Sequence, residues 1–308
     1  MKKFIAVLLI VTTLLSLCFV PAYAEKSVKP SIDHNLIREA FNEEIQKTIQ
    51  SGKAKGAVAT LVVEGKELLK TGYGYAVEDL GIESDPDLTG FRIGSISKTF
   101  VAVAALMAAE DGLLDFHTDI SEYLGVDFPK LRYPVTMHHL LTHTGGFEEI
   151  ITGMAVKNIS DTDPLSITVR KYIPEQIFKP GKVASYSNYG TALAAYVVEC
   201  ATGIDFADYS IDRIFKPLGM DHTTFAHTHD KVYVSHAYLP NGKETLEPYM
   251  NLYPEGSAVS TAHDMGTYIR WLMSDDANIL SLNGKEQLLS RQFSSSDELS
   301  GIGYIWNI

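Results

Sequence analysis

A serine and a lysine stand three positions apart at the start of a long apolar segment, in "FRIGSISKTFVAVAALMAAEDG". If the segment is a helix, Ser95 and Lys98 lie on one face of it. The apolar turns that follow draw both groups inward, where an amine loses solvation, its pKa falls, and it can take the proton of a neighbouring hydroxyl. The pair therefore predicts an activated nucleophile. The alternative is that Ser95 only caps the helix.

A phenol and an amide form a second polar pair in "YSN", where Tyr186 and Asn188 point the same way if the backbone is extended. A tyrosine beside a lysine ammonium has a favoured phenolate, so Tyr186 could move a proton between Ser95 and a leaving group. Asn188 could hold a substrate amide.

The elements around these residues follow from the spacing of apolar side chains. A helix is predicted over "DHNLIREAFNEEIQKTIQSG", ending near Gly52, and a hairpin over "GAVATLVV" and "ELLKTGYGYAV". A buried helix is expected from about Ser97 to Ala109, followed by helices and loops from Leu113 to Phe178.

Two further helices are predicted in the second half of the chain. One covers "YGTALAAYVVECATG", with Leu193 and Val197 on its apolar face and Gly203 at its end. The other covers "STAHDMGTYIRWLM" and begins with Thr261 and Asp264 at capping-box spacing. The order of elements favours a sheet layer beside an all-helical layer.

The first residues, "MKKFIAVLLIVTTLLSLCFVPAYA", have the layout of an export signal with a cleavage site after Ala24. We therefore expect residues 1–24 to be a signal peptide and the mature protein to act outside the cytoplasm. An uncleaved membrane anchor is the alternative. A lipoprotein modified at Cys18 is disfavoured, because Leu17 occupies a position that needs a small residue.

Cleavage would remove Cys18 and leave Cys200 alone, so a large core rather than a disulfide must hold the fold. It would also remove Lys2 and Lys3 and change the formal charge from −12 to −14. This charge disfavours nucleic acid as a partner. No later segment is long enough to span a membrane.

In these residues and their order along the chain, the sequence resembles the superfamily of serine β-lactamases and penicillin-binding proteins, above all its class C β-lactamase and D-alanyl-D-alanine carboxypeptidase branch. The resemblance rests on five segments in the family's order, from Ser95-Ile96-Ser97-Lys98 onward; the others are "LLTHTGGF", "PGKVASYSNYG", "IFKPLGMDHTTF" and "PEGSAVSTAHDM". It implies an α/β fold in which an antiparallel sheet flanked by helices adjoins an all-helical subdomain.

The resemblance also implies the roles of the site residues. Ser95 would be the acylated nucleophile, Lys98 and Tyr186 the proton-transfer pair, and Asn188 a substrate contact. The implied substrates are D-alanyl peptides of the cell wall, β-lactams, D-amino-acid peptides and small esters. No cofactor is expected, and the oligomeric state is left open.

The family carries a third motif, Lys-Thr-Gly or His-x-Gly, on a strand downstream of all these segments. The last residues of the sequence, "GIGYIWNI", resemble the lead-in to that strand, and the motif itself is not present after them. We therefore expect residues 25–308 to form one domain that is incomplete at its C-terminus. We expect neither Lys70-Thr71-Gly72 nor His143-Thr144-Gly145 to replace the motif. The rival hypothesis is a catalytically impaired fragment, or a relative that binds penicillin or peptidoglycan without turnover.

Four histidines within a short segment raise the question of a metal site; they are His222, His227, His229 and His236. Zinc sites usually show tighter spacing with carboxylate or thiolate partners. We expect ordinary loop and surface histidines here, and no metal.

Overall fold

The computed structural model of the protein describes residues 33–150, 153–226, 231–296 and 298–307. The predicted signal peptide, with Cys18, lies outside these ranges, as do His227 and His229. The architecture below is that of the compact unit that begins at His34.

A long antiparallel hairpin joins β1 (Gly56–Val63) to β2 (Lys66–Val77), as the sequence predicts. Glu64 and Gly65 at its tip have φ of 51° and 73°, the left-handed conformation of a tight two-residue hairpin turn. A short third strand, β3 (Ile82–Glu83), pairs with the end of β2. The sheet order is β1-β2-β3.

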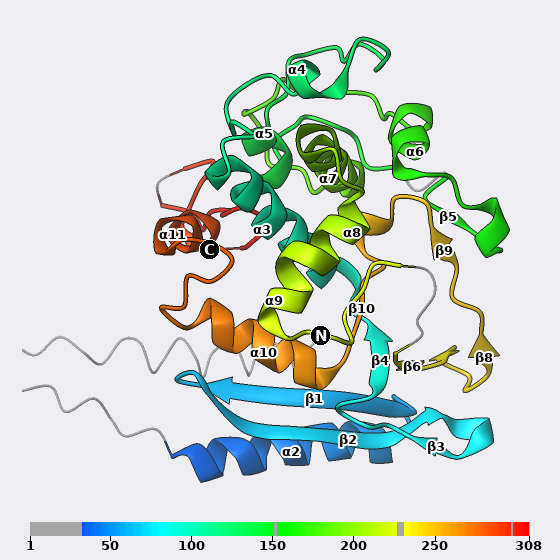
Figure 1. The fold of residues 1–308 in the computed structure, drawn as a ribbon. Helices are drawn as coiled ribbons and strands as arrows, with labels where there is room; N and C mark the ends of the chain where they lie inside the picture. The colour runs from blue at the N-terminus through cyan, green and yellow to red at the C-terminus, as the bar shows by residue number, and fades with distance from the viewer. Residues whose placement is uncertain (1–32, 151–152, 227–230, 297, 308) are drawn as a thin grey trace, which may run out of the picture. The chain divides into compact units, whose positions relative to one another are not determined.

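Two helices cover opposite faces of this sheet, α2 (His34–Gln50) and α10 (Ala262–Leu272) (Figure 1). Lys70 and Tyr73, three residues apart on β2, point to opposite faces. Lys70 meets His263 of α10, and Tyr73 donates a hydrogen bond to Asn42 of α2. The predicted helix over residues 33–52 is therefore confirmed as α2, which packs on the outer face of the sheet.

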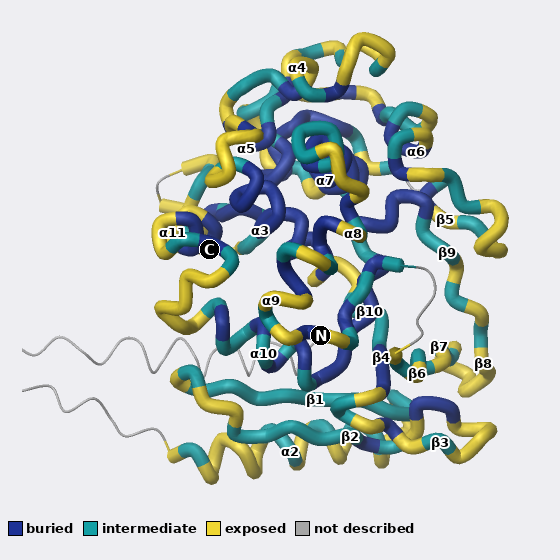
Figure 2. The backbone as a smooth tube through the Cα atoms, viewed as in Figure 1, coloured by how far each residue is buried: buried dark blue, intermediate teal, exposed yellow. Residues whose placement is uncertain are grey.

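The core of the unit is α3 (Ser97–Glu110), whose alanine-rich sequence is apolar on every side. All but the last two of its residues are buried. It packs against α7 (Asn188–Thr202), and both helices run through the buried centre of the fold (Figure 2). α7 ends as predicted at Gly203, with φ of 71°.

A second, short sheet has the order β10-β4-β6 and links the two layers. β4 (Thr89–Arg92) pairs antiparallel with β10 (Val259–Ser260) and parallel with β6 (Tyr233–Val234). The predicted antiparallel arrangement therefore describes the main sheet, whereas the β4–β6 pair is parallel. Because β4 runs directly into the start of α3, this sheet fixes where α3 begins.

The remaining described helices and helical turns are α4 (Ser121–Leu124), α5 (Met137–Leu141), α6 (Leu165–Lys171), α8 (Phe206–Ser210), α9 (Lys216–Leu218), α11 (Leu282–Leu289), η1 (Glu78–Leu80), η2 (Gly94–Ile96), η3 (Ile159–Asp161), η4 (Ile211–Phe215) and η5 (Tyr253–Glu255). The remaining described strands are β5 (Ala155–Val156), β7 (Ala237–Tyr238), β8 (Glu244–Thr245) and β9 (Tyr249–Met250). In the described part of the chain, no helix has both the length and the apolar composition needed to cross a membrane.

The capping box predicted at the start of α10 forms only in part. Thr261 accepts the backbone N–H of Asp264 at 3.2 Å, as expected of the cap. The Asp264 carboxylate, however, accepts from the backbone of His222 and the hydroxyl of Thr223 instead of returning to the cap. Tertiary contact with the segment after α9 thus replaces the local half of the motif.

Candidate active site

Ser95 lies in the single 3₁₀ turn η2, directly before α3. Gly94 enters this turn with φ of 53°, a conformation that suits glycine. The N-cap residue of α3 is Ile96, and no side chain caps the helix there. The alternative reading of Ser95 as a helix cap is therefore wrong, and its hydroxyl is directed to other partners.

These partners are the two groups that the sequence predicts. The Oγ of Ser95 lies 2.7 Å from the hydroxyl of Tyr186, and Lys98 donates to the same Oγ at 3.1 Å. The Lys98 ammonium also lies 4.9 Å from the centre of the Tyr186 ring. A hydroxyl, a phenol and an amine from two distant segments thus meet at one point.

Lys98 approaches this point from the interior, since only 1% of its surface is exposed. Its ammonium donates to the backbone carbonyl of Glu255 and lies 3.3 Å from the Glu255 carboxylate. Burial raises the pKa of Glu255, while the charge of Lys98 opposes that rise. The pairing of β10 with β4 brings this carboxylate to the first turn of α3.

Tyr186 comes from the extended segment that leads into α7. Ser187 has φ of −140° and ψ of 114°, so Tyr186 and Asn188 project to the same side, as predicted for an extended backbone. The side chain of Ser187 caps α7 by accepting from Gly190 at 3.0 Å. The cap holds the start of the helix, and with it the side chains of Tyr186 and Asn188.

His143 supports Tyr186 from behind, with the two ring centres 4.7 Å apart. Its Nδ1 accepts the backbone N–H of Ser187 at 3.3 Å. Burial, and secondarily the charge of Lys98, lowers the pKa of His143 to about 4. At neutral pH the imidazole is therefore uncharged, and it positions the tyrosine segment without adding a second cation.

Asn188 is held by an acidic neighbour, Glu149. The carboxylate of Glu149 accepts the Asn188 backbone N–H at 3.0 Å and its side-chain NH₂ at 2.7 Å. The side-chain oxygen of Asn188 is buried and has no hydrogen-bond partner among the described residues. In this structure the amide that the sequence predicts as a substrate contact thus meets a carboxylate of the chain itself.

The structure therefore brings together Ser95, Lys98 and Tyr186 and places Asn188 beside them. Sequence reasoning missed His143, Glu149 and Glu255 as neighbours of the site. His143 lies in the quoted segment "LLTHTGGF" and Glu255 in "PEGSAVSTAHDM". Glu149 follows the first segment by two residues, and nothing in the local spacing singles it out.

The two literal three-residue matches lie in different places. Thr71 and Gly72 are interior residues of β2, paired with Ala59 and Val58, and Lys70 faces Asp87 at 2.5 Å. His143 is part of the candidate site, as the neighbour of Tyr186.

The two described histidines of the predicted loop cluster have separate partners. His236 lies 3.0 Å from Glu244, and the backbone of His222 donates to Asp264. Across the described ranges, no group of three or more histidine, cysteine or acidic residues is arranged to hold a metal ion.

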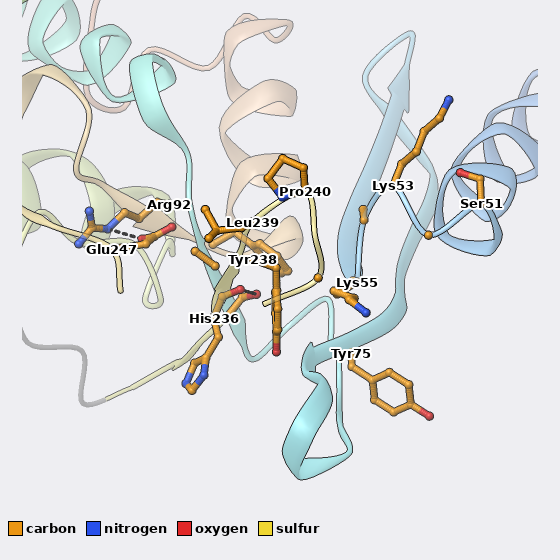
Figure 3. Close-up of a pocket in the computed structure, with 17 residues that line it drawn as sticks. Ser51, Lys53, Lys55, Tyr75, Arg92, His236, Tyr238, Leu239, Pro240 and Glu247 are labelled. Carbon is orange, nitrogen blue, oxygen red and sulfur yellow. Dashed lines mark hydrogen bonds and ion pairs between the residues drawn. The ribbon is translucent and has the colours of Figure 1, made fainter. Parts of the chain in front are cut away.

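A hollow of about 620 Å³ opens between the β1–β2 hairpin and the loop that carries β7 (Figure 3). Two of its cationic side chains pair with acidic neighbours: Lys55 with Glu78 at 2.6 Å and Arg92 with Glu247 at 2.8 Å. Ser95, Lys98 and Tyr186 are not among its lining residues. The chemistry of the candidate site is therefore separate from this hollow.

A helix-flanked antiparallel sheet beside a helical layer, with a serine, a buried lysine and a tyrosine at the mouth of the central helix, defines the β-lactamase-like class of serine hydrolase folds. Comparison with known proteins agrees. The family model described as Beta-lactamase matches residues 41–307, and the chain belongs to this family.

The Bacillus subtilis (strain 168) protein PbpX is 31% identical over 243 residues, which are 77% of this chain and 59% of that protein. The chain thus spans little more than half the length of this relative.

Two solved structures show the same fold. The hydrolase EstCE1, described as having promiscuous acyltransferase activity, superposes with a TM-score of 0.75 at 20% identity, covering 90% of this chain and 84% of that one. A β-lactamase/D-alanine carboxypeptidase from Pseudomonas syringae superposes with a TM-score of 0.72 at 21% identity, covering 90% and 75%. The predicted fold and the predicted family are therefore confirmed.

Proposed function

We propose that the protein is an exported serine hydrolase that acts through an acyl-enzyme on D-alanyl peptides, β-lactams or small esters. One observation carries the proposal: the Ser95 hydroxyl lies within hydrogen-bond distance of both the Tyr186 phenol and the Lys98 ammonium. The membership of the chain in the Beta-lactamase family supports the same reaction class.

In the proposed acylation, Ser95 Oγ attacks the substrate carbonyl and its proton passes to Tyr186, whose phenolate is stabilised by the nearby Lys98 ammonium. The backbone N–H of Ser95, next to the N-terminus of α3, donates to the oxygen that becomes negative. Tyr186 then returns the proton to the leaving group as the carbon–leaving-group bond breaks. Ser95 is left as an ester.

Deacylation reverses the proton path. A water molecule loses its proton to Tyr186 and attacks the ester carbonyl, and the tetrahedral intermediate collapses to the acid. The proton returns to Ser95 Oγ. Lys98 is held in place throughout by the carbonyl and carboxylate of Glu255.

The test is intact-mass spectrometry of protein expressed with its own leader, after incubation with a penicillin and, separately, with an activated ester or a fluorophosphonate. We expect one adduct per chain, and none in Ser95→Ala. The mass of the untreated protein also reports whether the mature chain begins at Glu25. No adduct from folded protein with any reagent would favour the rival hypothesis of a relative without turnover.

A further inference from the structure

Among the described residues, two carboxylates and one ammonium are linked by hydrogen bonds to the candidate site. The ammonium of Lys98 is buried, and it is engaged by both the carbonyl and the carboxylate of Glu255. His143 is uncharged at neutral pH, because burial and the Lys98 charge hold its pKa at about 4. Of these groups, Glu149 is the exposed one, and its carboxylate is hydrogen-bonded to Asn188.

The position of Glu149 is fixed by the loop that carries it. Glu148, its neighbour, donates its backbone N–H to Glu175 at 2.9 Å, and Phe147 is buried against the ring of Tyr189. Gly146 has φ of 80°, and a Cβ there would lie 2.1 Å from the carbonyl oxygen of Phe178. The backbone that leads up to Glu149 is thus held closely, and in this structure the Glu149 carboxylate lies against Asn188.

The polar atoms around Asn188 that remain open to a ligand are hydrogen-bond acceptors. The Asn188 side-chain oxygen is buried and unpaired among the described residues, and both Glu149 oxygens are acceptors. An unpaired buried acceptor is costly, and a ligand that donates to it recovers that cost. A primary ammonium carries three donors and a positive charge, whereas a carboxylate carries neither.

The order of Tyr186 and Asn188 along their segment bears on which end of the substrate carries the ammonium group. In the proposed reaction the Tyr186 hydroxyl faces the leaving group. Asn188 follows Tyr186 by two residues and lies on the same side of the extended backbone, which separates the two Cα atoms by roughly 7 Å. Because the leaving group occupies the space at the Tyr186 hydroxyl in that reaction, we assign the group that meets Asn188 and Glu149 to the acyl part of the substrate.

We propose that Glu149 is a specificity-determining residue that selects acyl donors carrying a primary ammonium on the acyl side and disfavours those carrying a carboxylate there. This inference rests on the proposed serine hydrolase function and narrows its substrate class. Uncharged acyl groups fall between the two, since they neither gain the ion pair nor meet the repulsion.

The experiment compares three para-nitrophenyl esters that differ in one ring substituent: meta-aminomethylbenzoate, meta-ethylbenzoate and meta-carboxybenzoate. Nitrophenolate release gives kcat/KM, and intact mass confirms the acyl-enzyme. We expect the cationic ester to exceed the anionic one by at least about tenfold at low salt. The ratio should fall with ionic strength, as it does for exposed charges.

Glu149→Gln keeps an oxygen for the Asn188 backbone and removes the charge. It should reduce the cation-to-anion ratio by roughly five- to tenfold. Glu148→Gln is the matched control, because among the described residues its side chain has no hydrogen bond to the cluster; its ratio should equal that of the unmodified protein.

Each other outcome has a distinct meaning. Acylation by the neutral ester with no charge preference, or a preference that Glu149→Gln leaves unchanged, overturns the assignment of Glu149 and leaves the hydrolase proposal standing. No acylation by any of the three esters overturns the selection by Glu149, and the hydrolase proposal falls with it only if the penicillin and the fluorophosphonate also leave no adduct.

Discussion

Lys98 and Lys285 are both buried, with 1% and 5% of their surface exposed, yet their surroundings differ. Lys285 donates to two backbone carbonyls at the end of α10, those of Trp271 at 2.6 Å and Ser274 at 3.0 Å. Its ammonium also lies 4.4 Å from the centre of the Trp271 ring. Lys98 faces a hydroxyl, a phenol ring and a carboxylate.

The difference teaches that burial alone does not make a lysine functional. Lys285 compensates the negative end of a helix and adds a charged donor to carbonyls at and just after its last turn, which is a structural role. Burial lowers the pKa of Lys285, as it would for any amine removed from water. Lys98 is distinguished by its partners, because one of them is a hydroxyl that can react.

The largest expected effect comes from removing Lys98. Lys98→Met together with Glu255→Gln should lower the acylation rate by about 1,000-fold or more, because the nucleophile loses its activator. Lys98→Met alone should in addition cost about 3 kcal/mol of stability, since it leaves the Glu255 carboxylate buried without its cation. Adduct formation by mass spectrometry and urea unfolding measure the two effects. Acylation retained in the folded double variant would contradict the assigned role.

An intermediate effect is expected at Lys285. Lys285→Met should cost about 2 kcal/mol in the free energy of unfolding, because two carbonyls at the end of α10 lose a charged donor. Its acylation rate should stay within twofold of the unmodified protein. Lys216→Met, which removes an exposed ion pair with Asp212, is the control and should cost under about 0.5 kcal/mol. A large loss of acylation in a folded Lys285→Met protein would erase the distinction between the lysines.

The smallest effect is electrostatic and concerns His143. Its pKa of about 4, against an ordinary 6.5, means that the unfolded chain binds a proton first as the pH falls. The contribution of His143 to the free energy of unfolding is therefore fully present above pH 6.5 and is lost as the pH falls from 6.5 to 4. Because the Lys98 charge contributes to the lowered pKa, the Lys98→Met/Glu255→Gln double variant should raise the pKa of His143 by less than about one unit.

NMR titration of the His143 ring measures this shift directly, with Lys285→Met as the variant that should leave it unchanged. A rise of equal size in both variants would show that lost packing, and not the Lys98 charge, controls the His143 pKa.

The sequence by itself determined the elements with strong local patterns. Spacing of apolar residues was enough for α2, α3 and α7, and the hairpin followed from two strand-like runs around Glu64 and Gly65. It also singled out Ser95, Lys98 and Tyr186 as the candidates for the chemistry, since they stand in short motifs that resemble those of the family to which the chain belongs. These features depend on neighbours within a few positions along the chain.

Only the tertiary structure decided which groups surround those residues. Glu255 reaches Lys98 through the β10–β4 pairing, and the loop before α6 brings Glu149 to Asn188. Asp264 likewise accepts a hydrogen bond from Thr223, 41 positions away, and not from its predicted local partner at the helix cap. Such contacts join segments far apart in sequence. Where the charges are buried, as in the Lys98–Glu255 pair, their electrostatic interaction is stronger because water does not screen it. No local spacing encodes them, because the packing of α3 against the second sheet and α7 sets their distances.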